Sequence, residues 1–300
     1  MDLFGTFTII GAIVCYLLAF QWGGTLKSWR SSDVIGTLVG FGLLSIVFVV
    51  IEYISGERAL LIGRLLKDRT ILAMCVFILF ASGAFFVLLY YLPIYFQTTR
   101  GASAQQSGID IIPLVLAAGL FSLVAGGLMT TLGHIIPIML VGSVFAAVAS
   151  GLIYTFEIDT PSSKWIGYQI LLGIGIGSVF QIPATAAQSV VNPEDLSSVS
   201  SMVLFFQMIG GSIWVSAAQA GFANKLVSSL PSVAPNVDPA RVLATGATEL
   251  RNVFTSEEVA GILIAYIDGL RVPFAIVIAC ASVTCLLSLT PRWEKINIRI

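Results

Sequence analysis

The sequence alternates long apolar blocks with short polar connections. Eight blocks are long enough to cross a hydrocarbon layer of about 30 Å at about 1.5 Å of helical rise per residue: 3–20, 34–54, 70–95, 109–130, 135–154, 165–190, 199–222 and 272–290. Lipid offers no hydrogen-bond partner to the backbone, so a spanning segment of this length must be helical. Barrel strands would be shorter and would alternate in polarity. The pattern therefore predicts an all-α, polytopic membrane bundle of about eight transmembrane helices.

Basic residues concentrate in one set of connections. The loop 56–69 and the C-terminal tail contain Arg58, Arg64, Lys67, Arg69, Arg292, Lys295 and Arg299. If all eight blocks span, both segments lie on the same side of the membrane. The short loops on the other side contain Lys27, Arg30, Arg100 and Lys164. Because cytoplasmic loops carry an excess of Lys and Arg, this distribution predicts that both termini lie in the cytosol.

One long connection, 223–271, has the character of a soluble segment. Leu243, Leu250 and Val253 recur at helical spacing, and Thr255 with Glu258 forms a capping-box sequence. We expect short amphipathic helices here, which lie on the outer membrane surface or over the bundle. The segment is interpreted as a structured extracellular loop.

Composition narrows the class of protein further. Hydrophobic residues make up 57 % of the chain and charged residues 10 %, against about 45–50 % and about 25 % in soluble domains. The formal net charge is −1, and the basic residues lie in loops rather than along one face. These values predict a protein whose main partner is the lipid bilayer, and they exclude nucleic-acid binding.

Residues for catalysis or metal binding do not cluster in the sequence. The four cysteines, Cys15, Cys75, Cys280 and Cys285, lie inside apolar blocks without metal-ligand spacing, so we interpret them as packing residues. The single histidine, His134, has no acidic or cysteine cluster near it in sequence. We therefore predict no enzyme activity, no metal and no cofactor.

Glycines inside the spans are interpreted as packing positions. The run Gly173, Gly175 and Gly177 resembles a nucleotide loop, but no strand precedes it and no Lys-Ser or Lys-Thr follows it. Gly173 and Gly177 lie about one helical turn apart, a spacing that lets a neighbouring helix approach closely. Gly210 and Gly211 are predicted to pack in the same way.

Polar and aromatic side chains within the spans are the candidates for a binding cavity, because each polar group in lipid needs a partner or water. Gln181 and Gln188 lie seven residues apart, on nearly one face of the sixth block, with Pro183 between them. The other candidates are Tyr90, Tyr91, Phe206 and Gln207. Together they would suit a cavity for small amphipathic molecules. An amide that merely bridges two helices remains the alternative for each glutamine.

No acidic residue lies in the middle of a span. Glu52 is near the inner end of the second block, and Asp110 is at the outer start of the fourth. A proton-coupled transporter normally needs a buried titratable group within the membrane. The sequence therefore does not identify a proton-coupling residue.

Several segments together resemble one family. They are the runs 18–24, 85–97, 105–108, 164–169, 181–188 and 205–211, which contain Gln21-Trp22-Gly23-Gly24, Tyr90-Tyr91-Leu92-Pro93 and Phe205-Phe206-Gln207. The chain is similar over essentially its whole length to the fungal 14-spanner drug:proton antiporters of the major facilitator superfamily. Multidrug and mycotoxin efflux pumps are the members it resembles most.

This resemblance implies a division of the chain. Residues 1–69 would form two linker helices and a basic cytoplasmic loop, and residues 70–300 would form the C-terminal six-helix bundle with the extracellular loop 223–271. The third, fourth, sixth and seventh blocks would face the central cavity, where Tyr91, Gln181 and Gln207 lie. The N-terminal six-helix half would be missing, so the chain is expected to be incomplete as a transporter.

The resemblance leads to three functional hypotheses. The first is proton-coupled efflux of drugs, toxins or secondary metabolites, with protons and a small amphipathic organic substrate as partners. The second is import of iron-chelating siderophores, and the third is a half-transporter or remnant that does not transport. The family expectation is the plasma membrane, with the vacuolar or vesicle membrane as the alternative.

Overall fold

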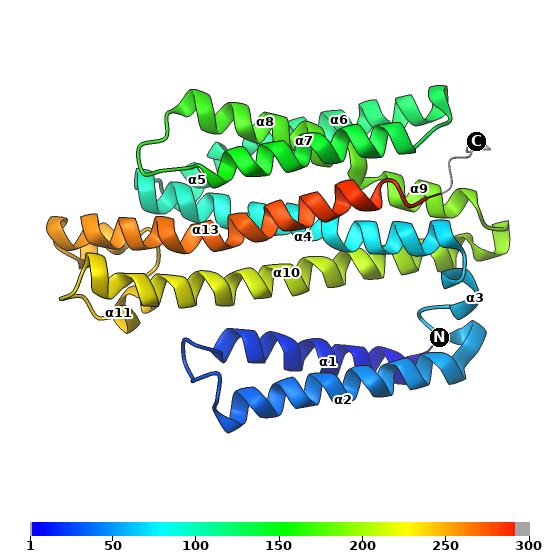
Figure 1. Cartoon of the computed structure of the whole chain (residues 1–300), viewed down its shortest axis with the longest axis horizontal. Coiled ribbons are helices and arrows are strands. Elements are labelled where there is room, and N and C mark those ends of the chain that lie inside the picture. The colour runs from blue at the N-terminus through cyan, green and yellow to red at the C-terminus, as the bar shows by residue number, and fades with distance from the viewer. Residues whose placement is uncertain (1, 292–300) are drawn as a thin grey trace.

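A computed structural model describes residues 2–291, which form a bundle of long helices (Figure 1). Within these residues, eight helical segments are long and apolar enough to cross a membrane. Their helices are α1 (Leu3–Trp22), α2 (Ser32–Ser55), α4 (Arg69–Arg100), α5 (Ala104–Asp110) with α6 (Ile112–Leu132), α7 (Ile136–Tyr154), α8 (Ser162–Phe180) with α9 (Ile182–Ser189), α10 (Leu196–Val233) and α13 (Ser256–Leu287). The predicted all-α bundle is confirmed, and each predicted block overlaps one of these segments.

Local sequence signals set the helix ends. The Asp68 side chain accepts hydrogen bonds from the N–H groups of Thr70 and Ile71 at the start of α4. At the other end of α4, Gly101 has φ +61°, and Gly133 has φ +66° after α6. Left-handed backbone of this kind is the usual way for a helix to stop at glycine.

Two predicted spans are interrupted. The sixth block divides at Gln181 into α8 and α9, and Pro183 occupies the first turn of α9. The fourth block begins with α5, and Pro113 lies in the first turn of α6. Proline is tolerated in a first helical turn, where its missing N–H would have no partner in the helix.

The prediction of a loop over 223–271 is wrong in its bounds. Helix α10 continues to Val233 and α13 begins at Ser256, so the connection is 234–255, with the short helices α11 (Pro239–Ala244) and α12 (Leu250–Val253). The Thr255–Glu258 capping box is present, but it opens α13 rather than a separate helix. Leu230 and Ile262 on the extended helices share a core cluster with Leu250. This packing stabilises the helical turns that lie beyond the predicted apolar blocks.

The bundle is arranged around α4, which packs against α10 and α13. Helix α13 also packs against α7, and α8 packs against both α6 and α7 (Figure 1). The first two helices form an antiparallel hairpin beyond α10, at the edge of the molecule, and α1 contacts α10. The remaining short helices are η1 (Gly56–Arg58), α3 (Gly63–Leu66) and η2 (Pro193–Asp195).

The loop 56–69 lies at the same end of the bundle as the start of α1 and the end of α13 (Figure 1). Arg69 Nε donates a hydrogen bond of 2.8 Å to the carbonyl of Thr290, which joins the start of α4 to the last described turn. The tail residues Arg292, Lys295 and Arg299 lie outside the described residues.

Candidate functional site: an apolar groove between α4 and α10

An open groove of about 480 Å³ runs between α4 and α10. We call it the α4–α10 groove. Its lining consists of Phe86, Leu89, Tyr90, Met208, Gly211, Ser212 and Val215. A volume of this size is within the range of small-molecule sites, about 300–1,000 Å³. None of these seven residues carries a formal charge. Their side chains supply aromatic rings, aliphatic groups, a thioether and two hydroxyl groups.

Two glycines let α10 approach α4 at the groove. A Cβ on Gly210 would fall on the carbonyl oxygen of Leu79 and 2.6 Å from the Ser82 hydroxyl. A Cβ on Gly211 would lie 2.7 Å from the Phe86 ring. Any larger residue would therefore displace one helix or one ring, so these glycines set the width of the groove floor.

Helix α4 turns Tyr90 and Tyr91 in different directions. Tyr90 is 50 % exposed and lines the groove, with its ring centroid 5.1 Å from that of Tyr91. Tyr91 is only 1 % exposed and packs against Phe222 of α10. The structure thus differs from the prediction at Tyr91, which is a core residue because the inner face of α4 is covered by α10 and α13.

The predicted glutamines are dispersed rather than gathered at the groove. Gln181 is exposed at the break between α8 and α9, and Gln207 is half-buried on α10. Gln188 Nε2 donates a hydrogen bond of 2.8 Å to Ser200 Oγ, which ties α9 to α10. Gln188 is therefore an amide that bridges helices, the alternative that the sequence left open for it.

Phe206 also lies away from the lining. Its half-buried ring packs against the core cluster at the α9 end of the bundle and makes an edge contact with Phe205. Of the six cavity candidates named from the sequence, Tyr90 is the one that lines the described groove. Gly211, which was named for packing, lines it too.

Gly173 and Gly177 of α8 lie against α6, whereas Gly175 lies against α7. A Cβ on Gly173 would lie 2.6 Å from the carbonyl oxygen of Leu114, and one on Gly177 would meet the carbonyl of Ala118. These two positions let α8 and α6 pack backbone to backbone.

Sequence reasoning missed most of the lining. Phe86, Leu89 and Tyr90 recur at spacings of three and four, as do Met208, Ser212 and Val215 on α10. That periodicity marks one face of each helix. The signal was available, but apolar residues recur on every face of a membrane helix, so it did not single out this face.

The two buried carboxylates among the described residues lie far in sequence from the residues that line the groove. Asp2 and Glu52 are 8 % and 9 % exposed, at the start of α1 and near the end of α2. Glu52 accepts hydrogen bonds from the N–H groups of Leu60 and Leu61 at 3.3 and 2.6 Å. Glu52 thereby holds the loop 56–69, whereas Asp2 accepts a hydrogen bond from the N–H of Gly5 and caps α1. Over residues 2–291, no three His, Cys, Asp or Glu side chains are grouped so as to hold a metal ion.

Comparison with family models decides the class of protein. The model of the Major Facilitator Superfamily matches residues 3–215. The chain belongs to the Major Facilitator Superfamily. As a member, it is an integral, multi-pass membrane protein, in agreement with its eight candidate spans.

Curated relatives of this superfamily member come from filamentous fungi. An MFS-type transporter of Pestalotiopsis microspora is 44 % identical over 98 % of this chain and 54 % of its own length. An MFS-type transporter of Trichoderma harzianum is 45 % identical over 96 % of this chain and 50 % of its own length. A protein named as a dehydrocurvularin exporter, from Aspergillus terreus, is 37 % identical over 99 % and 52 %. The chain spans about half the length of the curated relatives it matches.

A solved structure has the same fold. It is a bacterial homologue of the human lysosomal transporter Spinster, in an inward-facing and occupied conformation. Its TM-score to this chain is 0.59 at 15 % identity, over 89 % of this chain and 59 % of that one. At this identity the likeness concerns the fold of the superfamily alone.

Proposed function

We propose that this chain is the C-terminal portion of an exporter of small amphipathic molecules, and that the α4–α10 groove forms one wall of its substrate pathway. The observation that carries the proposal is the groove itself, an open, uncharged, aromatic-lined surface halfway along two spanning helices. Relatives named as a probable efflux pump and as a dehydrocurvularin exporter support export rather than import. Drugs, toxins and secondary metabolites are the substrate class that suits such a lining.

The division of the chain proposed from sequence is kept, with residues 1–69 as a linker unit and 70–300 as the six-helix transporter bundle. Transport by alternating access needs two bundles that rock about a site near the midplane. A chain that spans about half of its relatives would supply one of these bundles. A six-helix N-terminal half would supply the opposite wall of the pathway.

We further propose that export is coupled to protons and that both termini face the cytosol. The basic loop with Arg58, Arg64, Lys67 and Arg69 supports this orientation. Because no groove residue is a carboxylate, the proton-coupling group would lie elsewhere, either in this chain or in the other half. The plasma membrane is the proposed location.

The test is transport by the chain together with an N-terminal half. We would co-express it with the first six helices of the Pestalotiopsis microspora relative in yeast that lacks its own drug exporters, and measure accumulation of a neutral, labelled aromatic lactone. Lower accumulation than with either part alone supports export. Higher accumulation of a labelled siderophore would instead indicate import, and no change in either compound would favour a protein that does not transport.

The variant Ser212→Phe tests whether the groove belongs to the substrate pathway. Ser212 is exposed in the groove, so a phenyl ring there fills the space without entering the core. The control is Leu286→Phe on α13, where the native side chain is 69 % exposed. Export that is lost with Ser212→Phe and kept with Leu286→Phe assigns the groove to the pathway.

A further inference from the structure

The α1–α2 hairpin touches the C-terminal bundle at several levels along α10. In the middle of the hairpin, the Tyr16 hydroxyl donates a hydrogen bond of 3.1 Å to the carbonyl of Ile213. Nearer the loop 56–69, the rings of Phe48 and Phe205 stack with centroids 6.3 Å apart. Contacts at different depths resist both tilting and sliding of the hairpin against α10.

The turn that connects α1 and α2 is also tied to α10. Asn224 Nδ2 donates to the carbonyl of Gly23 at 3.2 Å and to the carbonyl of Ala220 in its own helix at 2.7 Å. Gly24 has φ +77°, and the Asn224 side chain occupies the space that a Cβ on Gly24 would need. The turn and α10 therefore fit each other at a specific register.

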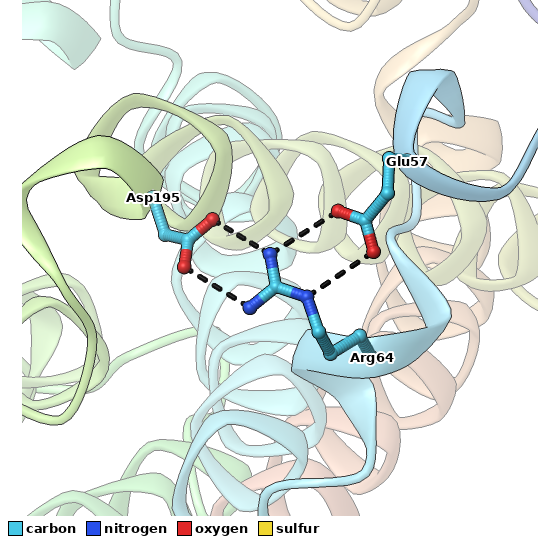
Figure 2. Close-up of polar contacts among 3 residues, drawn as sticks. All are labelled: Glu57, Arg64 and Asp195. Atoms are coloured by element: carbon cyan, nitrogen blue, oxygen red, sulfur yellow. Dashed lines mark hydrogen bonds and ion pairs between the residues drawn. The ribbon is translucent and has the colours of Figure 1, made fainter.

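At the opposite end, one arginine joins the loop after α2 to the start of α10. Figure 2 shows the Arg64 guanidinium between two carboxylates, with two hydrogen bonds to each. The N–O distances are 3.1 and 3.1 Å to Glu57, and 3.1 and 2.9 Å to Asp195. The planar fork of arginine makes paired bonds of this kind in a fixed orientation. We call these three residues the Arg64 clamp.

The clamp has features that isolated surface ion pairs lack. A single exposed pair contributes little, because solvent screens it and two long side chains must be ordered. Here the Asp195 side chain is only 16 % exposed. Asp195 also immediately precedes α10, where the helix dipole stabilises a negative charge. The two carboxylates raise the pKa of Arg64 still further above its ordinary value, and the guanidinium of an arginine is charged throughout the physiological range.

We infer that the hairpin and the C-terminal bundle move as one rigid body, and that Arg64 is the positioning residue that fixes the start of α10 to the hairpin. Helix α10 carries Met208, Gly211 and Ser212 of the groove. The two linker helices thus brace one wall of the groove rather than serving as a flexible tether. This inference concerns the mechanics of the chain and goes beyond the proposed transport function, so it can fail or hold independently of it.

The experiment measures the distance between the hairpin and the far side of the bundle. Spin labels are placed at Tyr53→Cys on α2 and Leu123→Cys on α6, whose native side chains are 89 % and 77 % exposed. The four native cysteines are replaced, and the purified full chain is studied in lipid nanodiscs by pulsed electron paramagnetic resonance. We expect one narrow distance distribution for this labelled parent.

Breaking the clamp should broaden that distribution. Arg64→Gln and Asp195→Asn are each expected to widen it at least twofold. The charge swap Arg64→Glu with Asp195→Arg should narrow it again when it is combined with Glu57→Gln, which removes the carboxylate that would otherwise repel the new glutamate. Arg58→Gln is the control, since this exposed arginine lies in the same loop but forms none of the ion pairs of the described residues. Circular dichroism and size-exclusion chromatography check that each variant is folded, and Asp195→Asn carries the test if Arg64→Gln is not.

Four results would overturn the inference. A broad distribution in the labelled parent would show that the hairpin is not fixed to the bundle. Unchanged widths in both single variants would show that the clamp does not hold it. Equal broadening by Arg58→Gln, or a charge swap that stays broad, would show that the loop matters but the Arg64–Asp195 pairing does not.

Discussion

The contact between α10 and α4 at Gly210 yields the sharpest prediction about stability. A methyl group there would strike the backbone carbonyl of Leu79 and lie 2.6 Å from the Ser82 hydroxyl. A backbone carbonyl cannot rotate out of the way, so Gly210→Ala must push the two helices apart. Overpacking of this kind typically costs about 1–3 kcal/mol.

A matched control removes the effect of helix propensity. Alanine favours a helix over glycine by up to about 1 kcal/mol, and this gain applies equally at Gly126, in the interior of α6, where a Cβ would meet nothing within 4 Å. We therefore expect Gly210→Ala to be less stable than Gly126→Ala by the overpacking cost alone, about 1–3 kcal/mol.

The assay is equilibrium unfolding of the purified chain in mixed micelles, with increasing mole fraction of SDS and with circular dichroism as the signal. The difference in unfolding free energy between the two alanine variants is the quantity to compare. If Gly210→Ala proves as stable as Gly126→Ala, then α10 does not approach α4 as closely as described, and the account of the groove floor fails with it.

Other predictions concern single side chains. Tyr91→Ala should lower the unfolding free energy by about 3–5 kcal/mol, as for other large buried aromatics. Tyr90→Ala should leave the unfolding free energy nearly unchanged and weaken the binding of a neutral aromatic ligand, measured by fluorescence titration. The reverse pattern would mean that α4 is rotated about its axis. A double-mutant cycle of Gln188→Leu and Ser200→Ala should give a coupling energy of about 0.6 kcal/mol, the average for membrane-helix hydrogen bonds, and zero coupling would count against the bridge. Arg251→Gln, which removes hydrogen bonds to two carbonyls at the end of α4, should speed hydrogen exchange in that last turn, measured by mass spectrometry against the unchanged first turn.

The pattern of apolar blocks along the chain specifies where the spans lie. Each apolar block had to become a helix because lipid leaves the backbone no other partner, and each of the eight predicted blocks overlaps a spanning segment of the structure. The capping box at Thr255 was also visible, because it depends on residues three positions apart. Helix formation in lipid and helix capping can be recognised in a sequence because they depend on the solvent and on neighbouring residues, not on contacts between distant segments.

Packing between helices sets which residues face the groove, where α10 ends and where α13 begins. Tyr90 and Tyr91 are chemically identical neighbours, yet one is half exposed and the other is buried, because packing against α10 and α13 fixes the rotation of α4 about its axis. In lipid, apolar residues cover every face of a helix, so periodicity does not reveal that rotation. The turns beyond Phe222 remain helical because they pack against α13, a contact between segments far apart in the chain.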